Sequence, residues 1–205
     1  MEKIVIASKN KGKIAEMRPV LENLGFEVCS LPDDFPEIAE EGGSFIENAL
    51  IKASTAADAL GMPAVADDSG LCVDVLEGAP GIYSARFSND TEPLPGETAD
   101  ERNNRKLLKV LEGVEDRAAA YFCAMALVYP EGSKHLPIIG KGTWEGEILK
   151  APRGSNGFGY DPVFLDPELG LTGGEMTFEQ KNARSHRAKA LASLAGQLRL
   201  ERETV

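Results

Sequence analysis

The feature that most constrains the fold of this chain is a short apolar run, 64–66, that leads directly into Asp67-Asp68-Ser69-Gly70. The run predicts a buried strand that ends at two adjacent carboxylates. Carboxylates beside a core must be paired, hydrogen-bonded or bound to a metal ion, and oxygen ligands of this kind suit Mg2+ or Mn2+. Asp, Ser and Gly are also ordinary turn formers, so the rest of the sequence has to decide between a turn and a functional site.

Size and charge narrow the possible classes. The chain has 205 residues, 42% of them apolar, which suits a single domain over 1–205 with a real core. The net charge of −11 disfavours binding to nucleic acid or to an anionic membrane by charge alone, although a small polyanion could bind where Lys and Arg gather. The three widely spaced cysteines favour a reducing compartment. No run approaches ~18 apolar residues, so we expect a cytoplasmic protein.

Apolar spacing and capping signals predict alternating strands and helices. We expect a strand at 4–7, a helix kinked by Pro19, a strand at 26–31, and a helix that Ser44 and Glu47 cap and that ends at Leu60. The later expectations are a surface loop at 77–97, a helix capped by Thr98 and Glu101, a long strand at 118–129, a hairpin of 135–139 with 143–149, and a last helix from about Ser185. This order predicts a mixed α/β domain on one twisted sheet.

The loop after the first predicted strand is a candidate anion site. Such a loop lies where backbone N–H groups and the positive end of a helix gather around anions. Its polar residues are Ser8, Lys9, Asn10, Lys11, Gly12 and Lys13. The loop has no Walker A pattern, and a solvated basic loop is the alternative interpretation.

Acidic residues form a second candidate site. Glu40 and Glu41 precede the predicted Ser44 helix, and Asp67 and Asp68 follow it. A strand-helix-strand connection can bring both segments to one end of a sheet, where two or three carboxylates would make a Mg2+ site completed by water and substrate phosphates. Glu side chains in loops are most often simply solvated.

Two later stretches suit a flat, polar ligand. Residues 154–162 place three glycines around Phe158 and Tyr160, and aromatic faces stack on nucleobases. Asp161 or a nearby amide could read the edge of a base, although a Gly-rich loop with core aromatics is the alternative. His186 and Arg187 fall in the first turn of the last predicted helix, where cations are disfavoured unless they face an anion or a polar ligand.

The combination of motifs is more specific than any one of them. In order, they are Asn-x-Gly-Lys, Phe-x-Glu-Asn-Ala-x-x-Lys-Ala, Ala-Asp-Asp-Ser-Gly-Leu, Gly-Ala-Pro-Gly-Ile-Tyr-Ser-Ala-Arg-Phe, Gly-Phe-Gly-Tyr-Asp-Pro, and Lys181 followed by Ser-His-Arg. From Ile4 to about Leu198 the chain resembles the inosine/xanthosine triphosphate pyrophosphatase family. The resemblance implies an elongated α/β domain with a central twisted mixed sheet flanked by helices, two lobes around an active-site cleft, and a homodimer.

The resemblance also implies an activity and its residues. The activity is Mg2+-dependent hydrolysis, with Mn2+ as an alternative ion, of ITP, dITP and XTP to the monophosphate and pyrophosphate. By position, Asp68 is the catalytic carboxylate and binds the metal together with Glu40. The implied substrate-binding residues are Ser8, Lys9, Asn10, Lys11, Gly12 and Lys13 at the phosphates, Ser69, and Phe158, Gly159, Tyr160, Asp161, Lys181, His186 and Arg187 at the nucleoside and base.

The chain departs from the family pattern in two loops. Ser8-Lys9 stands where the family usually has Thr-Gly or Thr-Asn, and Ser155-Asn156 where it usually has Thr-Gly. Both loops keep their size and polarity, so we expect altered detail rather than lost activity. Two other functions remain open: a related pyrophosphatase for modified pyrimidine nucleotides, or a non-catalytic nucleotide-sensing module.

Overall fold

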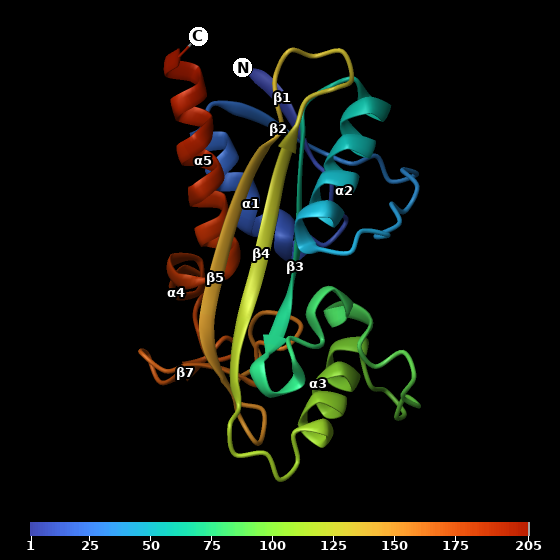
Figure 1. The fold of residues 1–205 in the computed structure, drawn as a ribbon, viewed down its shortest axis with the longest axis vertical. Helices are drawn as coiled ribbons and strands as arrows, with labels where there is room; N and C mark the ends of the chain where they lie inside the picture. Colours follow the sequence, from blue (N-terminus) through green and yellow to red (C-terminus); the bar gives the residue numbers. More distant parts are fainter. Residues whose placement is uncertain (205) are drawn as a thin grey trace. The chain divides into compact units, whose positions relative to one another are not determined.

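The chain folds around one mixed sheet with helices on its sides (Figure 1). The computed structural model describes residues 1–204, with side chains to 203, and Val205 of the predicted 1–205 domain lies outside the described residues. The sheet has the order β2-β1-β3-β4-β5-β6-β7. Its strands are β1 Glu2–Ile6, β2 Phe26–Ser30, β3 Ala64–Val73, β4 Ala118–Val128, β5 Ile138–Ile148, β6 Phe164–Asp166 and β7 Leu171–Thr172.

Parallel and antiparallel pairs share this sheet. Strand β1 runs parallel to β2 and β3, whereas β6 runs antiparallel to β5 and β7. The helices are α1 Lys11–Asn23, α2 Phe45–Leu60, α3 Ala99–Val110, α4 Phe178–Arg184 and α5 His186–Thr204, with short 3-10 segments at Asp74–Leu76 and Gly81–Arg86. The predicted α/β class with a mixed, helix-flanked sheet is confirmed.

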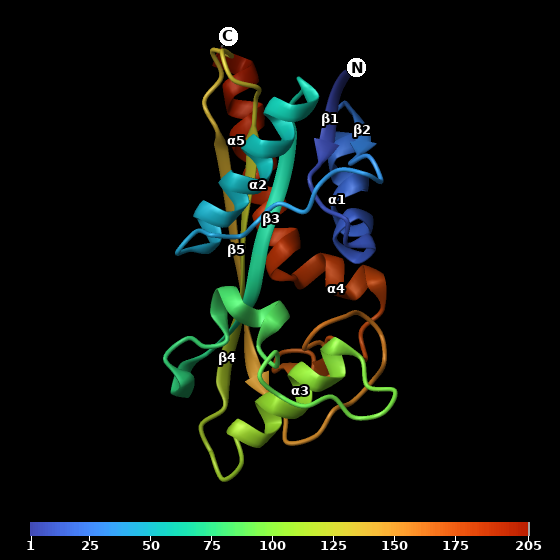
Figure 2. The same cartoon turned by 90° about the vertical axis from the view of Figure 1, so that its right-hand side faces the viewer.

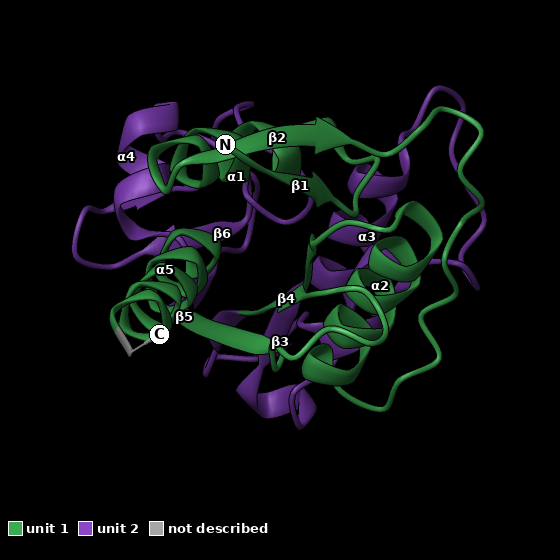
Figure 3. Ribbon diagram, turned by 90° about the horizontal axis from the view of Figure 1, so that it is seen from above, with its two compact units in different colours: residues 1–68, 123–143, 186–205 green, residues 69–122, 144–185 purple. Residues whose placement is uncertain are grey.

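The residues divide into two compact units (Figure 3). Unit 1 comprises 1–68, 123–143 and 186–205, and unit 2 comprises 69–122 and 144–185. Strands β3, β4 and β5 contribute residues to both units, so neither unit is a continuous stretch of chain.

In unit 1 the core lies between the sheet and two helices. Helices α1 and α5 supply Met17, Leu21, Leu191 and Leu194, which pack with alternate residues of β1 and β4. Helix α2 lies beside β3 in both side views (Figures 1 and 2). Its buried face carries small residues at helical spacing, namely Ala49, Ala53, Ala56 and Ala57.

Unit 2 has its own apolar core. It is built around the rings of Tyr121, Trp144 and Phe164, which contact one another at centroid distances of 4.7 to 6.1 Å. Leu107 of α3 and Leu111, the residue that caps this helix, also belong to this cluster. The interval 77–97, predicted as a loop, contains the 3-10 segment Gly81–Arg86.

The predicted hairpin at 135–149 is wrong, because β5 is one strand that runs from Ile138 to Ile148. Two glycines lie where the turn was expected, and they allow close packing against α5. A Cβ at Gly140 would lie 2.2 Å from the Ala190 carbonyl oxygen, and a Cβ at Gly142 would lie 2.2 Å from that of His186. Only glycine lets the helix backbone approach the strand this closely.

Three local expectations also need correction. Strand β3 does not end at the carboxylates but continues to Val73, so Asp67 and Asp68 lie inside the strand. Helix α1 begins at Lys11, so half of the predicted 8–13 loop is helical. A separate helix, α4, precedes the last one and was missed because it has only 7 residues. Pro19 lies within α1.

Candidate active site

Asp68 is the centre of a polar cluster in unit 1. It is 5% exposed, and its two carboxylate oxygens have different partners. Asp68 Oδ2 accepts a hydrogen bond of 3.0 Å from Asn48 Nδ2, and Lys52 Nζ lies 3.3 Å from Asp68 Oδ1. The same ammonium group lies 2.6 Å from Glu40 Oε1. Two carboxylates from different segments thus converge on one positive charge.

Helix α2 organises this cluster through one face. Asn48 and Lys52 are four residues apart, which places both side chains on the same side of the helix. Asn48 also joins the acidic loop to β3, since its Oδ1 accepts a hydrogen bond of 2.8 Å from the Gly42 N–H. A Cβ at Gly42 would lie 2.7 Å from that oxygen, so glycine is required for this approach.

The ionisation of the cluster follows from burial and charge. Burial raises the pKa of Asp68 above its ordinary value, with Lys52 opposing the rise and Glu40 adding to it. Burial would lower the pKa of Lys52, but Asp67, Asp68 and Glu40 together raise it. Lys52 therefore stays charged, and Asp68 holds a proton more readily than an exposed aspartate does.

Asp67, the neighbouring carboxylate, belongs to a different network. Arg187 Nε lies 3.1 Å and Lys13 Nζ also 3.1 Å from Asp67 Oδ2. Arg187 Nη1 lies 2.6 Å from Glu16 Oε2. Burial would raise the pKa of Asp67, but Lys13 and Arg187 hold it well below its usual range. The lowered pKa favours the ionised form of Asp67. Arg187, predicted at the base, is fully buried in this ion-pair network.

The predicted phosphate segment forms the start of α1. Asn10 is the N-cap, and its Oδ1 accepts a hydrogen bond of 3.2 Å from the Lys13 N–H. The first turn of a helix has N–H groups that no helical carbonyl can reach. Lys9 Nζ donates hydrogen bonds to the carbonyl oxygens of Asp33 and Phe35. Lys9 and Lys11 are exposed to solvent, and Ser8 is half-buried.

The second predicted substrate segment, 158–161, lies in unit 2 around a buried carboxylate. Asp161 Oδ2 accepts hydrogen bonds of 2.8 Å from the Phe158 N–H and 2.7 Å from Lys181 Nζ. The Lys181 ammonium also lies 4.4 Å from the centre of the Phe158 ring. Gly157 has a positive φ of 76°, and a Cβ there would collide with the Asp161 carboxylate.

Tyr160 connects this loop to the rest of unit 2. Its hydroxyl donates a hydrogen bond of 2.8 Å to the Ser84 carbonyl oxygen. The Ser84 hydroxyl in turn accepts a hydrogen bond of 2.9 Å from the Leu71 N–H, two residues beyond Ser69 in β3. The structure therefore brings Phe158, Tyr160, Asp161 and Lys181 together. The polar cluster of unit 1 holds Glu40, Asp68 and Lys52.

Asn48 and Lys52 entered the sequence analysis only as part of the motif Phe-x-Glu-Asn-Ala-x-x-Lys-Ala, with no role assigned to either. The available signal was that both interrupt an otherwise small, apolar helix face at a spacing of four residues. His186 lies in the first turn of α5, as expected, and its side chain is buried. Glu41, which the sequence left as an alternative to Glu40, is exposed to solvent.

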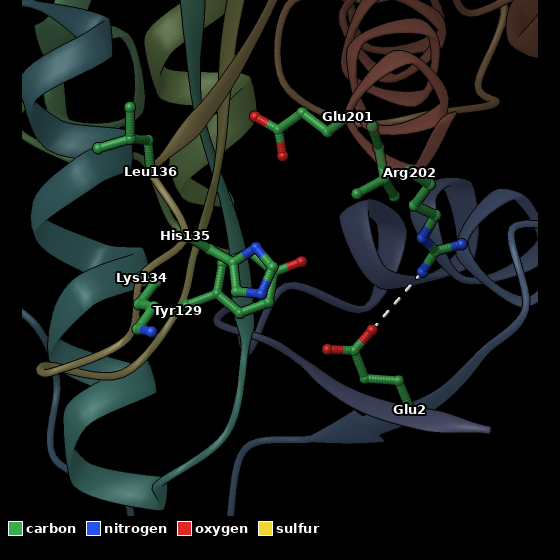
Figure 4. A pocket seen from close by; sticks show the side chains of 8 residues that line it. Glu2, Tyr129, Lys134, His135, Leu136, Glu201 and Arg202 are labelled. Carbon is green, nitrogen blue, oxygen red and sulfur yellow. Dashed lines mark ion pairs between the residues drawn. The ribbon is translucent and has the colours of Figure 1, made fainter. Parts of the chain in front are cut away.

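Unit 1 also has a pocket of about 560 Å³, which is lined by none of the residues of the Asp68 cluster (Figure 4). The rings of Tyr129 and His135 stack there with centroids 4.3 Å apart, and Arg202 pairs with Glu2 at 3.6 Å. It is chemically unlike the Asp68 cluster, because its acidic and basic groups surround a largely apolar lining.

Comparison with known proteins gives consistent matches over nearly the whole chain. The model of the Ham1 family matches residues 4–197. A dITP/XTP pyrophosphatase from Nitratidesulfovibrio vulgaris is 53% identical over 196 residues, covering 93% of each chain. One from Geobacter sulfurreducens is 49% identical and covers 97% of each.

Solved structures agree with these relatives. A HAM1 protein from Coxiella burnetii has a TM-score of 0.85 and 42% identity, covering 97% of this chain and 98% of its own. The Staphylococcus aureus Ham1 protein has a TM-score of 0.83 and 39% identity, covering 98% of this chain and 100% of its own. The fold and the family likeness therefore extend over the same residues.

Proposed function

The chain belongs to the Ham1 family, and on this premise we propose that it hydrolyses the non-standard purine nucleotides ITP, dITP and XTP to the monophosphate and pyrophosphate. The relatives named dITP/XTP pyrophosphatase support this substrate class. The observation that carries the proposal is the cluster around Asp68, in which a buried carboxylate, a second carboxylate and a lysine converge. Such a cluster suits attack of a water molecule on a phosphorus atom, with a charged phosphate oxygen as the leaving atom.

The cluster fits a divalent metal by its donor chemistry. Glu40 and Asp68 would hold Mg2+ or Mn2+, since both supply hard oxygen ligands and their carboxylates converge from two different segments. No three His, Cys, Asp or Glu side chains converge on a metal position within residues 1–204, so water and substrate oxygens would complete the shell. When bound, the ion would offset the charge of the triphosphate and acidify a bound water.

The residues of this chain then divide the work of the reaction. Asp68 orients the attacking water, or transiently accepts its proton, as the water approaches the α-phosphorus. Asn48 donates a hydrogen bond to Asp68 Oδ2 and so fixes the orientation of the carboxylate. Lys52, with the N-terminal turn of α1 and Ser8, Lys9, Asn10, Lys11, Gly12 and Lys13, offsets the charge that builds on the leaving pyrophosphate.

We assign the nucleoside and base to Ser69, Phe158, Gly159, Tyr160, Asp161, Lys181, His186 and Arg187. Hypoxanthine and xanthine carry an oxygen acceptor at C6, whereas adenine carries an amino donor. The Lys181 ammonium or a backbone N–H in the 158–161 loop satisfies the oxygen and would be left unpaired against adenine, which rejects a wrong base strongly. Guanine is excluded at its 2-amino group by Asp161 or the Phe158 loop.

The proposal includes a cellular setting. We expect one pyrophosphatase domain over 1–205, a homodimer and a cytoplasmic location. No helix within residues 1–204 has the length and apolarity needed to cross a bilayer.

The test is a substrate panel assayed for pyrophosphate release with and without Mg2+. The panel contains ITP, dITP, XTP, GTP, ATP and a modified pyrimidine triphosphate. We expect metal-dependent release from the first three and little from GTP or ATP. Release from the pyrimidine alone would replace the substrate class, and binding without any release would make the protein a nucleotide sensor.

A further inference from the structure

We propose that helix α3 positions the base-binding loop, with Asp100 and Asn104 holding the backbone of Gly159 from both sides. The inference deepens the proposed function, since it concerns the loop assigned to the base. Asp100 Oδ2 accepts a hydrogen bond of 2.7 Å from the Gly159 N–H. Asn104 Nδ2 donates a hydrogen bond of 2.9 Å to the Gly159 carbonyl oxygen. Neither side chain belongs to the residues assigned above.

The two side chains are presented by one rigid surface. Asp100 and Asn104 are four residues apart, so they lie on the same face of α3. The start of this helix is fixed by a complete capping box between Thr98 and Glu101. Two hydrogen bonds from one capped helix therefore restrain both polar groups of a single loop residue.

Gly159 is the point in the loop where such restraint matters. Its φ is +62°, and a Cβ there would meet nothing within 4 Å, so the backbone conformation and not space calls for glycine. Its neighbours are anchored elsewhere, Phe158 through its N–H to Asp161 and Tyr160 through its hydroxyl to Ser84. Fixing Gly159 sets the direction of the Phe158 ring relative to these anchors.

Helix α3 and the 152–162 segment also line one pocket. Its volume is about 570 Å³, and its lining includes Asp100, Asn104, Leu108, Phe158 and Gly159. Tyr160 belongs to the same buried apolar cluster as Leu107 of α3, whereas Gly159 has no side chain to pack. The hydrogen bonds with Asp100 and Asn104 are thus the direct polar links between α3 and Gly159.

The orientation of Asn104 supports a dedicated role. Among the described residues, Asn104 Oδ1 is one of the buried side-chain oxygens with no hydrogen-bond partner. Leaving a buried acceptor unpaired carries a free-energy cost. The opposite amide orientation would set this oxygen against the Gly159 carbonyl, so the observed one indicates that the bond to Gly159 decides how the amide lies.

The test compares Asn104→Ala with Asn103→Ala, a matched change one residue away on the same helix. Asn103 binds the backbone of Ser88 and Ala85 and does not contact Gly159. We expect Asn104→Ala to raise KM for ITP about 3- to 10-fold with kcat within about twofold, the loss typical of one hydrogen bond that orients a binding group. Asn103→Ala should lower Tm and leave KM unchanged.

Asp100 offers a second pair of variants. Asp100→Leu removes the acceptor for Gly159 N–H and should raise KM by a similar factor, whereas Asp100→Asn keeps an acceptor oxygen and should restore most of the affinity. If Asp100 only stabilised the start of α3, both variants would have a changed Tm. Their KM values for ITP would then not differ from each other.

Amide hydrogen exchange of 157–161 gives a readout that needs no activity. Exchange in this loop should be faster in Asn104→Ala and Asp100→Leu than in Asn103→Ala. Equal exchange in all three, with unchanged KM, would overturn the positioning role. Failure of the wild-type protein to hydrolyse any purine triphosphate would instead reject the proposed function, and the exchange data would still decide the role of α3.

Discussion

Asp67 and Asp68 are adjacent in sequence, but their pKa values shift in opposite directions. They have different partners because successive side chains of a strand point to opposite faces. One face meets Lys13 and Arg187, which hold the pKa of Asp67 low despite burial. The other face meets Asn48 and Lys52, where burial raises the pKa of Asp68. The sequence predicts the pair of carboxylates but not this division, since the partners come from α1, α2 and α5.

The division makes a prediction about two matched substitutions. Asp68→Asn should lower kcat for ITP about 1000-fold, within the range for loss of a general base, and change nucleotide affinity far less. Asp67→Asn should instead destabilise the fold by about 3 to 5 kcal/mol, as for a broken buried ion pair. Steady-state kinetics and urea unfolding measure the two effects. Near-normal turnover by Asp68→Asn would remove it from the catalytic role.

The environment of Asp166 predicts that the free energy of unfolding falls at acid pH. Its carboxylate accepts hydrogen bonds from Trp144 Nε1 at 2.9 Å and from Arg184 Nε at 2.6 Å. Burial opposes ionisation, but Arg184 and Trp144 lower the pKa below the ordinary 3.8. The unfolded chain therefore binds this proton first, and the stabilisation that is present above pH 3.8 is lost as the pH falls through the lowered pKa.

Urea unfolding of the wild-type protein and Asp166→Asn between pH 6 and about pH 2.5 checks this prediction. The wild type should be the more stable protein at pH 6, and the difference between the two should shrink as the pH falls below about 4. A difference independent of pH would contradict the account.

At the scale of elements, the sequence predicted the features that depend on neighbouring residues, such as the start of a helix. Ser44 and Thr98 cap α2 and α3 as expected, although Glu47 accepts a hydrogen bond from Gly43 rather than completing the box at Ser44. The predicted hairpin at 135–149 is wrong because a contact with a distant element, and not the local sequence, determines the structure there. The glycines of β5 allow the backbone of α5 to approach the strand, and α5 lies far along the sequence. No local pattern distinguishes a glycine needed for such a contact from a glycine in a turn.

Two glycine substitutions test that explanation. Gly142→Ala should destabilise the protein by about 1 to 3 kcal/mol or more, because its Cβ would overlap the His186 carbonyl oxygen. Gly196→Ala, in the exposed middle of α5 with nothing within 4 Å of its Cβ, should stabilise it by about 0.5 to 1 kcal/mol. Chemical unfolding compares them, and equal effects of the two variants would show that the close approach of α5 to β5 is unimportant.

At the scale of the whole molecule, the motifs predicted the family and the fold class, whereas the stretches of chain that make up each compact unit were not predictable. Each unit is assembled from separate stretches, and the boundary falls between Asp68 and Ser69 and again between Ser185 and His186. The net charge of −11 gives no hint of a polyanionic substrate either. The positive groups that suit one are local, at the start of α1 and at Lys52.

The most direct test of the proposed reaction is hydrolysis of ITP in water labelled with oxygen-18, followed by mass spectrometry of the products. Attack of water on the α-phosphorus predicts inosine monophosphate that carries one labelled oxygen together with unlabelled pyrophosphate. Label in pyrophosphate would place the attack at the β-phosphorus. Release of inorganic phosphate with inosine diphosphate would mean cleavage at the γ-phosphorus, and either result would contradict the account.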